Sequence, residues 1–239
     1  MKKNYFIACF LCLTQGLMAQ TDNANSLIRD VNGNLGMGTY MTSTFDSRYE
    51  GFKGSPLFIS EWIKGQMAFV DGKVFKEIPL KYNAYTKELL MKRPSGDSLI
   101  VFPYQVLSFT INDPVTKADF TFKRYPKAQT PKYDMRDVYF LVLYEGKTSL
   151  LKLVSKTLKK ADFKDPYSNN VRYDTYEDDN SYYLLKADGS MVKVKRSKKS
   201  VLDALSDKEI AIKALLEQEK IEFKSERELV RVVAKYDVI

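Results

Sequence analysis

The chain contains no histidine, and both of its cysteines, Cys9 and Cys12, lie close to the N-terminus. The missing imidazole excludes His-based catalytic triads and haem or zinc ligation by histidine. Because the two thiols are confined to the N-terminal stretch, the rest of the chain has no cysteine nucleophile, no Cys/His zinc site and no disulfide. The sequence also lacks a P-loop, a dinucleotide-binding fingerprint and a G-x-S-x-G elbow. We therefore expect no metal and no cofactor.

Long apolar runs are missing too, and the one short run near the N-terminus has the features of an export signal. Lys2 and Lys3 precede an apolar segment, Tyr5 to Leu13, that is too short to span a bilayer. Leu17-Met18-Ala19 ends in the small residue that signal peptidase requires, which predicts a signal peptide over 1–19. The chain is thus predicted to be exported, with no transmembrane span.

A lipoprotein signal is the main alternative for this segment. It requires a small residue directly before the modified cysteine and an aliphatic residue three positions before it. Cys12 follows Leu11 and does not fit, while Cys9 follows Ala8 but has Phe6 at the aliphatic position. The pattern therefore favours removal of the signal before Gln20 over lipidation.

The formal charge of the chain is +8, with 38 basic and 30 acidic residues. Removal of Lys2 and Lys3 with the signal leaves 36 basic residues and a net charge of +6. Both signs are interspersed, as on an ordinary soluble surface, although such an excess attracts anionic surfaces. Export makes nucleic acid an improbable partner, so we expect no nucleic-acid binding.

Residues 39–196 alternate short apolar runs with turn residues, which predicts antiparallel strands. Asp71-Gly72 separates two apolar runs and is typical of a hairpin with a tight two-residue turn. The residues predicted to share the buried face of the strand after this turn are Val74, Ile78, Leu80, Tyr82 and Ala84. The predicted fold is mainly β, an antiparallel sandwich, roll or barrel, after a flexible lead-in at 20–38.

Residues 197–239 follow a different pattern, with capping boxes that begin at Ser200, Ser206 and Ser225. The first predicts a single turn, and the second predicts a helix to about Glu219. The predicted apolar sides are Ile210, Ala214 and Leu215 for the second box and Leu229, Val232, Val233 and Tyr236 for the third. Because short amphipathic helices need a surface to pack on, we expect this helical segment to dock on the β domain.

Charged and aromatic clusters supply the candidate sites. The acidic stretch 174–180 has the oxygens of a calcium loop but neither its spacing nor its glycine, which favours a solvated loop. The densest basic cluster suggests a polyanion contact or, more simply, an edge strand protected by lysine. Its residues are Lys193, Lys195, Arg196, Lys198 and Lys199.

Tyrosines near this cluster could form a sugar-stacking platform, or could instead cap the core or rim of the β domain. The candidate platform residues are Tyr173, Tyr176, Tyr182 and Tyr183, with the single tryptophan, Trp62, distant in sequence. Paired carboxylates for hydrolysis remain an alternative, although no local motif nominates a pair.

Several segments together resemble a group of uncharacterised secreted proteins of Bacteroidota, over most of the chain that follows the signal. They are G-S-P-L-F from Gly54, G-Q-M-A-F-V-D-G-K from Gly65, P-L-K-Y-N-A-Y from Pro79, L-Y-E-G-K-T-S-L-L-K from Leu143 and K-K-S-V-L-D-A-L-S-D-K from Lys198. The resemblance implies an exported β-rich protein with a helical tail and supplies no catalytic residues. The C-terminus reads as helical, unlike the β-rich sorting domain of type IX secretion cargo in that phylum. This difference favours retention of the protein in the periplasm or at the outer membrane, as a peripherally associated protein.

The function that these features predict is that of a non-enzymatic cell-envelope protein, a binding or structural module for an envelope protein or a surface polymer. The alternative is an Asp/Glu-dependent hydrolase of envelope glycans.

Overall fold

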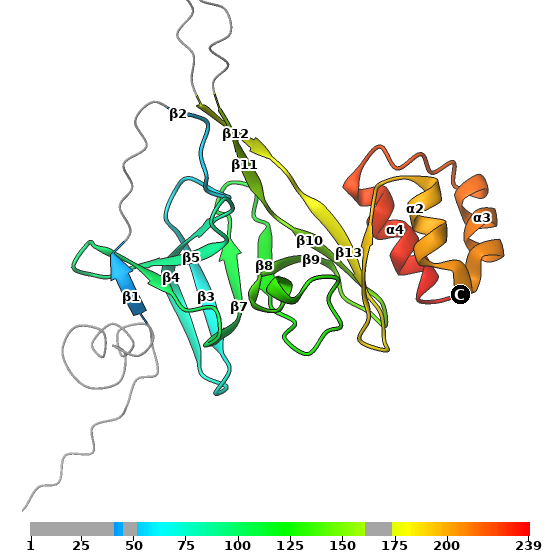
Figure 1. Ribbon diagram of the computed structural model, residues 1–239. Helices are drawn as coiled ribbons and strands as arrows, with labels where there is room; N and C mark the ends of the chain where they lie inside the picture. Colours follow the sequence, from blue (N-terminus) through cyan, green and yellow to red (C-terminus); the bar gives the residue numbers. More distant parts are fainter. Residues whose placement is uncertain (1–40, 45–51, 161–173) are drawn as a thin grey trace, which may run out of the picture.

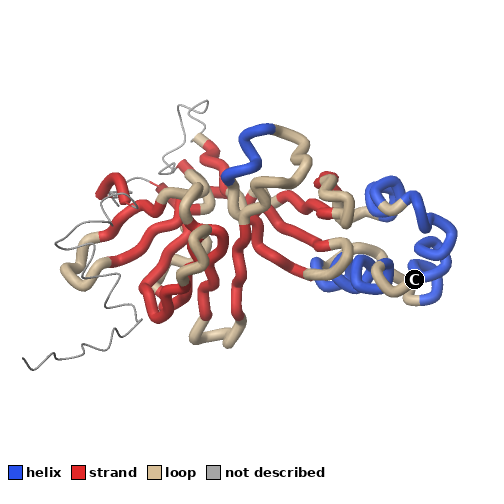
Figure 2. The backbone as a smooth tube through the Cα atoms, turned by 90° about the horizontal axis from the view of Figure 1, so that it is seen from below, coloured by secondary structure: helices blue, strands red, loops and turns tan. Residues whose placement is uncertain are grey.

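The computed structural model describes residues 41–44, 52–160 and 174–239 and is mainly β, as the sequence predicts. The predicted signal peptide, the lead-in at 20–38 and Tyr173 lie outside the described residues. In the part of the chain that the structure describes, the strands form one eleven-stranded and one three-stranded sheet, with helices at one end (Figures 1 and 2).

The large sheet is antiparallel throughout. Its strands lie in the order β1 (Met41–Thr44), β6 (Ser98–Val101), β5 (Glu88–Lys92), β4 (Val74–Asn83), β3 (Ile63–Phe69), β7 (Val106–Asn112), β8 (Asp119–Lys123), β9 (Phe140–Tyr144), β10 (Ser149–Leu153), β13 (Ser181–Leu185) and β14 (Met191–Val194). Most neighbours are consecutive in sequence, so short hairpins build most of the sheet.

The small sheet extends the hairpin of β10 and β13. Its strands are β11 (Lys156–Lys159), β12 (Asp174–Asp178) and β2 (Phe52–Lys53), in that order. β11 and β12 are antiparallel, whereas β12 and β2 are parallel. The acidic stretch that the sequence assigned to a polar loop is therefore largely strand, which corrects that assignment.

The hairpin loops that contain Gly72 and Gly189 share one hydrogen-bonding arrangement. In the β3–β4 loop the Gly72 N–H donates to Phe69 O and the Phe69 N–H donates to Lys73 O. Gly72 has a φ of 88°, and Asp71 accepts a hydrogen bond from the Lys73 N–H. The loop thus has three residues, of which Val70 is the first and Gly72 the last, and not the two predicted from Asp71-Gly72. The β13–β14 loop repeats the arrangement around Gly189.

Bulges displace side chains that strict alternation placed in the core. Gly65 pairs with Ile78 and Met67 with Phe75, so two residues of β4 lie opposite one of β3, and Glu77 has a φ of 59°. The bulge reverses which of the alternating side chains of β4 point into the core. Phe75 packs inward against Phe69, while Val74 is 50% exposed, contrary to the prediction. An irregularity between β3 and β7 leaves Leu107 exposed in the same way.

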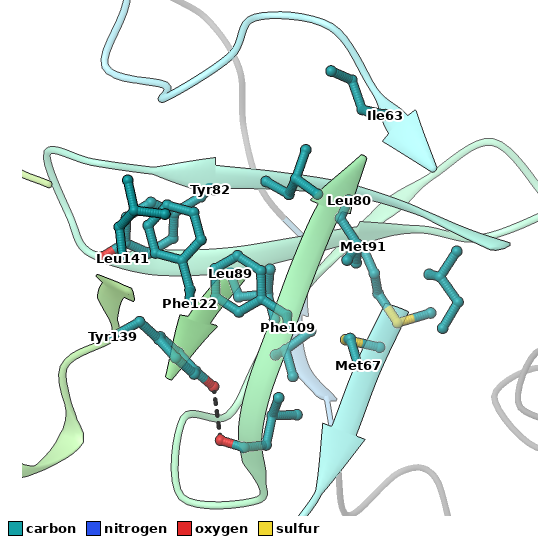
Figure 3. Close-up of a cluster of buried hydrophobic side chains, with 14 of the residues drawn as sticks. Ile63, Met67, Leu80, Tyr82, Leu89, Met91, Phe109, Phe122, Tyr139 and Leu141 are labelled. Carbon is teal, nitrogen blue, oxygen red and sulfur yellow. Dashed lines mark hydrogen bonds between the residues drawn. The ribbon is translucent and has the colours of Figure 1, made fainter. Parts of the chain in front are cut away.

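Strands β3 to β9 curl around an aromatic core, the roll core (Figure 3). Phe109 and Phe122 stack with ring centroids 4.7 Å apart, and Tyr82 and Tyr139 lie beside them. The Tyr139 hydroxyl donates to Val106 O at 3.1 Å, as the dashed line in Figure 3 marks. Val106 O also accepts from Nε of the buried Arg124, which ties the start of β7 to the end of β8.

The other half of the large sheet is covered on both faces, as the apolar run over 138–144 predicts. On one face, the segment that contains η2 (Tyr133–Asp137) covers Phe140, Leu151, Tyr183 and Met191. On the opposite face, Leu150, Leu184 and Val194 pack against α2 (Lys198–Ala204), α3 (Glu209–Gln218) and α4 (Glu226–Tyr236). The helices therefore complete the core of this half of the sheet.

Helix α4 matches its predicted pattern. The Ser225 hydroxyl accepts from the Glu228 N–H, the Glu228 carboxylate accepts from the Lys224 N–H, and the predicted apolar stripe is buried. Of the other two boxes, the one at Ser200 was predicted to start a single turn but lies inside a helix. The one at Ser206 was predicted to start a helix, which instead begins at Glu209 and ends as expected near Glu219. α2 is capped by Ser197, and Ser206 begins a 3-10 turn, η3 (Ser206–Lys208).

Helix α3 buries a different side from the one predicted. Ile212 and Leu216 face the core, whereas Ile210 is 86% exposed. The stretch is apolar at Ile210, Ala211, Ile212, Ala214, Leu215 and Leu216, so periodicity cannot select one side. Packing against α2 and α4 makes the selection.

Gly65 provides a test of how tightly β3 is held. A Cβ on this residue would overlap the carbonyl oxygen of Thr110 on β7, so Gly65→Ala should cost about 3 kcal/mol of stability through overpacking. Gly72→Ala meets no atom within 4 Å and should cost only about 1 kcal/mol, from its positive φ. Gln66→Ala, on the exposed side of β3, is the neutral control. Urea unfolding measures all three, and equal costs for the two glycines would contradict the steric account.

Tyr82 provides a second test. Its hydroxyl is buried with no hydrogen-bond partner among the described residues, and burial raises its pKa well above the ordinary value. Tyr82→Phe should therefore stabilise the protein by about 1 kcal/mol, because an unsatisfied polar group is removed. Tyr139→Phe deletes a made hydrogen bond and should destabilise by about 1 kcal/mol. Thermal unfolding compares the pair, and a destabilised Tyr82→Phe would show that its hydroxyl has a partner.

Candidate interaction surfaces

The predicted basic cluster lies at the free edge of the large sheet and the start of α2. Lys193 is on β14, and Lys195 and Arg196 follow it. The edge is partly closed, because the Met191 N–H donates to Gln129 O and the Lys195 N–H donates to the Ser200 hydroxyl. The simpler of the two interpretations, an edge strand protected by lysine, fits this arrangement.

Two members of the cluster have partners within the chain. Arg196 donates to Lys224 O at 3.1 Å, and the Lys198 ammonium lies 3.8 Å from the Glu217 carboxylate. Lys193, Lys195 and Lys199 are exposed. The structure thus brings the five cations together, with part of their charge used to hold the helical segment.

Tyr182 belongs to the junction between the sheet and α4. Its hydroxyl donates to the Glu226 carboxylate at 2.8 Å, and Lys152 Nζ lies 2.7 Å from the same carboxylate. The Lys152 and Arg196 cations each lie 5.9 Å from the centroid of the Tyr182 ring. Glu226 is in the first turn of α4, where the helix dipole favours a carboxylate. This network anchors the N-terminus of α4 on β10 and β13.

Trp62 is placed elsewhere, directly before β3. The Lys81 ammonium lies 4.8 Å from the centroid of its ring and so covers one face. Desolvation at this position lowers the pKa of Lys81. Tyr183 is buried on the sheet face opposite Tyr182, against the η2 segment. The platform predicted from Tyr176, Tyr182, Tyr183 and Trp62 is therefore not assembled, and Tyr173 lies outside the described residues.

Tyr176 instead joins two aromatic residues that the sequence did not single out. Its ring centroid lies 5.7 Å from that of Phe52 on β2 and 5.4 Å from that of Tyr85 in the β4–β5 turn. We call Phe52, Tyr85 and Tyr176 the aromatic trio. Asn83, two residues before a tyrosine at a hairpin tip, was a sequence signal for Tyr85. The strand β2 has only two residues and gave no such signal for Phe52.

The acidic residues of β12 are paired with lysines of β11 and with Lys160, which follows that strand. Lys156 and Lys160 lie 3.7 and 2.7 Å from the carboxylates of Asp178 and Asp174, and Lys159 lies 3.5 Å from Glu177. Among the described residues, no group of three or more aspartate, glutamate or cysteine side chains is placed to hold a metal ion.

A second surface lies at the β3–β4 hairpin, which projects from the lower end of the sheet in Figure 1. Large apolar side chains are exposed there from the hairpin and from the adjacent segment that leads into β7, and the Val70 N–H joins the two by donating to Gln105 O. These residues, which we call the hairpin patch, are Val70 (60% exposed), Val74 (50%), Tyr104 (56%) and Leu107 (42%). The sequence predicts that Val74 is buried, and the β4 bulge exposes it, while the irregularity between β3 and β7 exposes Leu107.

None of the described helices is long and apolar enough to cross a membrane.

The pH dependence of stability tests the Tyr182 network. Burial, and then the hydrogen bond to Glu226, raise the pKa of Tyr182 to about 12, above the value of about 10 for an unfolded tyrosine. The neutral phenol therefore favours the folded state, and this contribution is present below pH 10 and is lost as the pH rises from about 10 towards 12. Tyr182→Phe should lose less stability over that range than the unmodified protein, by urea unfolding at a series of pH values. An equal decline of the unfolding free energy in both proteins would show that Tyr182 is not the group whose raised pKa contributes to stability.

Comparison of the chain with models of known protein families, with curated proteins and with solved structures gives no match.

Proposed function

We propose that this chain is a non-enzymatic, exported protein of the cell envelope that binds another protein through the hairpin patch. Export rests on the N-terminal segment 1–19, with its lysine pair, short apolar run and small residue before Gln20. The non-enzymatic part rests on the absence of histidine from the sequence and of cysteine beyond Cys12.

The observation that carries the binding function is the grouping of exposed apolar side chains at one projecting hairpin. Single exposed apolar residues are common, but several that gather on neighbouring segments beside polar residues are typical of interaction sites. Val70 and Val74 alternate with charged or polar residues, among them Asp71, Lys73 and Lys76, which supply these polar neighbours. A tyrosine beside aliphatic residues is the composition expected at the centre of a protein interface.

Rigidity also supports this assignment. The loop that presents Val70 is held by the hydrogen bonds around Gly72 and by the Asp71 cap, and Phe75 packs behind it in the roll core. Tyr104 is held beside Phe102, with ring centroids 5.1 Å apart. A surface fixed before binding loses little conformational entropy when a partner docks, so these side chains are well placed to contribute affinity.

Carboxylates in the loops have structural roles. Asp71, Asp113 and Asp188 each accept the N–H of the residue two positions later, and hydrogen bonds in these turns lower the pKa of all three. A glycan hydrolase needs one carboxyl with a raised pKa as its general acid. These three carboxyls are shifted in the opposite direction, so none of them is suited to be that general acid.

Substitution within the hairpin patch tests the proposal. The double variant Val70→Ser/Leu107→Ser should capture at least about tenfold less of its partner than the unmodified chain, because buried apolar anchors carry most of the affinity of an interface. The assay is chemical cross-linking in envelope fractions of cells that make the full chain, followed by mass spectrometry. Urea unfolding verifies that the variant remains folded.

Val115→Ser is the matched control, since Val115 is 86% exposed but lies alone in the β7–β8 loop. Its cross-linked products should equal those of the unmodified chain. Identical products from all three proteins would exclude the patch as the contact, and recovery of the chain from the cytoplasm alone would exclude export.

A further inference from the structure

The aromatic trio has a fixed geometry built from three separate segments of the chain. Phe52 is held by the parallel pairing of β2 with β12. Tyr85 is positioned by Asn83, whose side-chain oxygen accepts the N–H groups of Tyr85 and Thr86 at 3.0 and 3.1 Å. Gly54 approaches so closely that an added Cβ would lie 3.3 Å from Tyr176 O. Each ring is thus held in place by its own backbone.

The Tyr85 turn is also fastened to the small sheet itself. The Lys156 N–H on β11 donates to Ala84 O, and the Ala84 N–H donates to Pro56 O. Tyr85 nevertheless remains 41% exposed, and Phe52 and Tyr176 are partly exposed. Aromatic surface that is so firmly positioned and still open to water is a feature that favours a ligand.

Charged pairs stand on both sides of the trio along the strands. Alternate residues of β12 share a face, so Asp174 and Asp178 flank Tyr176 at about 7 Å each, from the rise per residue of a strand. Each of these carboxylates has its lysine on or next to β11, Lys160 for Asp174 and Lys156 for Asp178. The Asp174 carboxylate raises the pKa of Lys160, and the neighbouring Tyr85 and Tyr176 phenols contribute to the increase. The ammonium group is held by the Asp174 carboxylate, two residues from Tyr176 on β12.

We propose that the aromatic trio, with the flanking pairs Lys160–Asp174 and Lys156–Asp178, is a binding site for a saccharide. A sugar ring has an apolar face of C–H groups and a rim of hydroxyls. The exposed rings fit the face, and the ammonium and carboxylate groups can donate to and accept from the hydroxyls. The hairpin patch is mainly aliphatic, with Tyr104 as its one aromatic residue, so the two surfaces suit different partners. This saccharide site is separate from the proposed protein contact and does not depend on it.

The decisive variant is Tyr85→Ala, which removes the most exposed ring from a turn that Asn83 continues to hold. The probes are a printed array of oligosaccharides, purified peptidoglycan sacculi and lipopolysaccharide. The unmodified chain should bind at least one of them. Tyr85→Ala should weaken that binding about tenfold, the scale of one lost aromatic stacking contact. Tyr85→Phe keeps the ring and should retain most of the binding.

Tyr104→Ala is the matched control, because Tyr104 is an exposed tyrosine of the hairpin patch. It should leave saccharide binding unchanged, and Tyr85→Ala should leave the cross-linked protein products unchanged. Absence of binding to all three probes by the unmodified chain, or equal binding by Tyr85→Ala, would overturn the saccharide site without affecting the protein contact.

Discussion

The close approach of β3 to β7 at Gly65 is the constraint on which the rolled half of the molecule depends. With no side chain at that position, the Thr110 carbonyl lies where a Cβ would otherwise be, and the bulge at Lys76-Glu77 on β4 begins directly opposite. The bulge bends β4 and increases the local twist, which lets the sheet curl around its aromatic rings. The same bend turns Phe75 inward and Val74 outward. Core and hairpin patch are thus two consequences of one local geometry.

The second half of the molecule is organised by the contact between sheet and helices. Sheet residues such as Leu150 and Leu184 are completely buried because α4 covers them. Polar contacts fix both ends of that helix. Glu226 holds its N-terminus to Lys152 and Tyr182, and Asp237 accepts the Thr148 N–H at its C-terminus. A helix of eleven residues is marginal alone, so its stability comes from this docking.

How far the sequence predicts the structure depends on whether a signal is local. The mainly β class, the glycine-containing hairpins and the α4 stripe follow from alternation, turn chemistry and a capping box, and the structure has all three. The exposure of Val74 and the buried side of α3 could not be predicted, because a bulge shifts the alternation and α3 is apolar on both sides. The aromatic trio could not be predicted from the sequence, for another reason. Phe52, Tyr85 and Tyr176 meet only through long-range strand pairing.

The partly closed edge at β14 limits how molecules of this kind can associate. Backbone groups at both ends of that strand are already bonded, to Gln129 and to Ser200, and a lysine side chain stands between them. A strand from another molecule would have to displace both contacts before it could extend the ladder. Growth of the sheet into a fibre is therefore disfavoured on this side, where another molecule would dock more readily through side-chain contacts than by strand pairing.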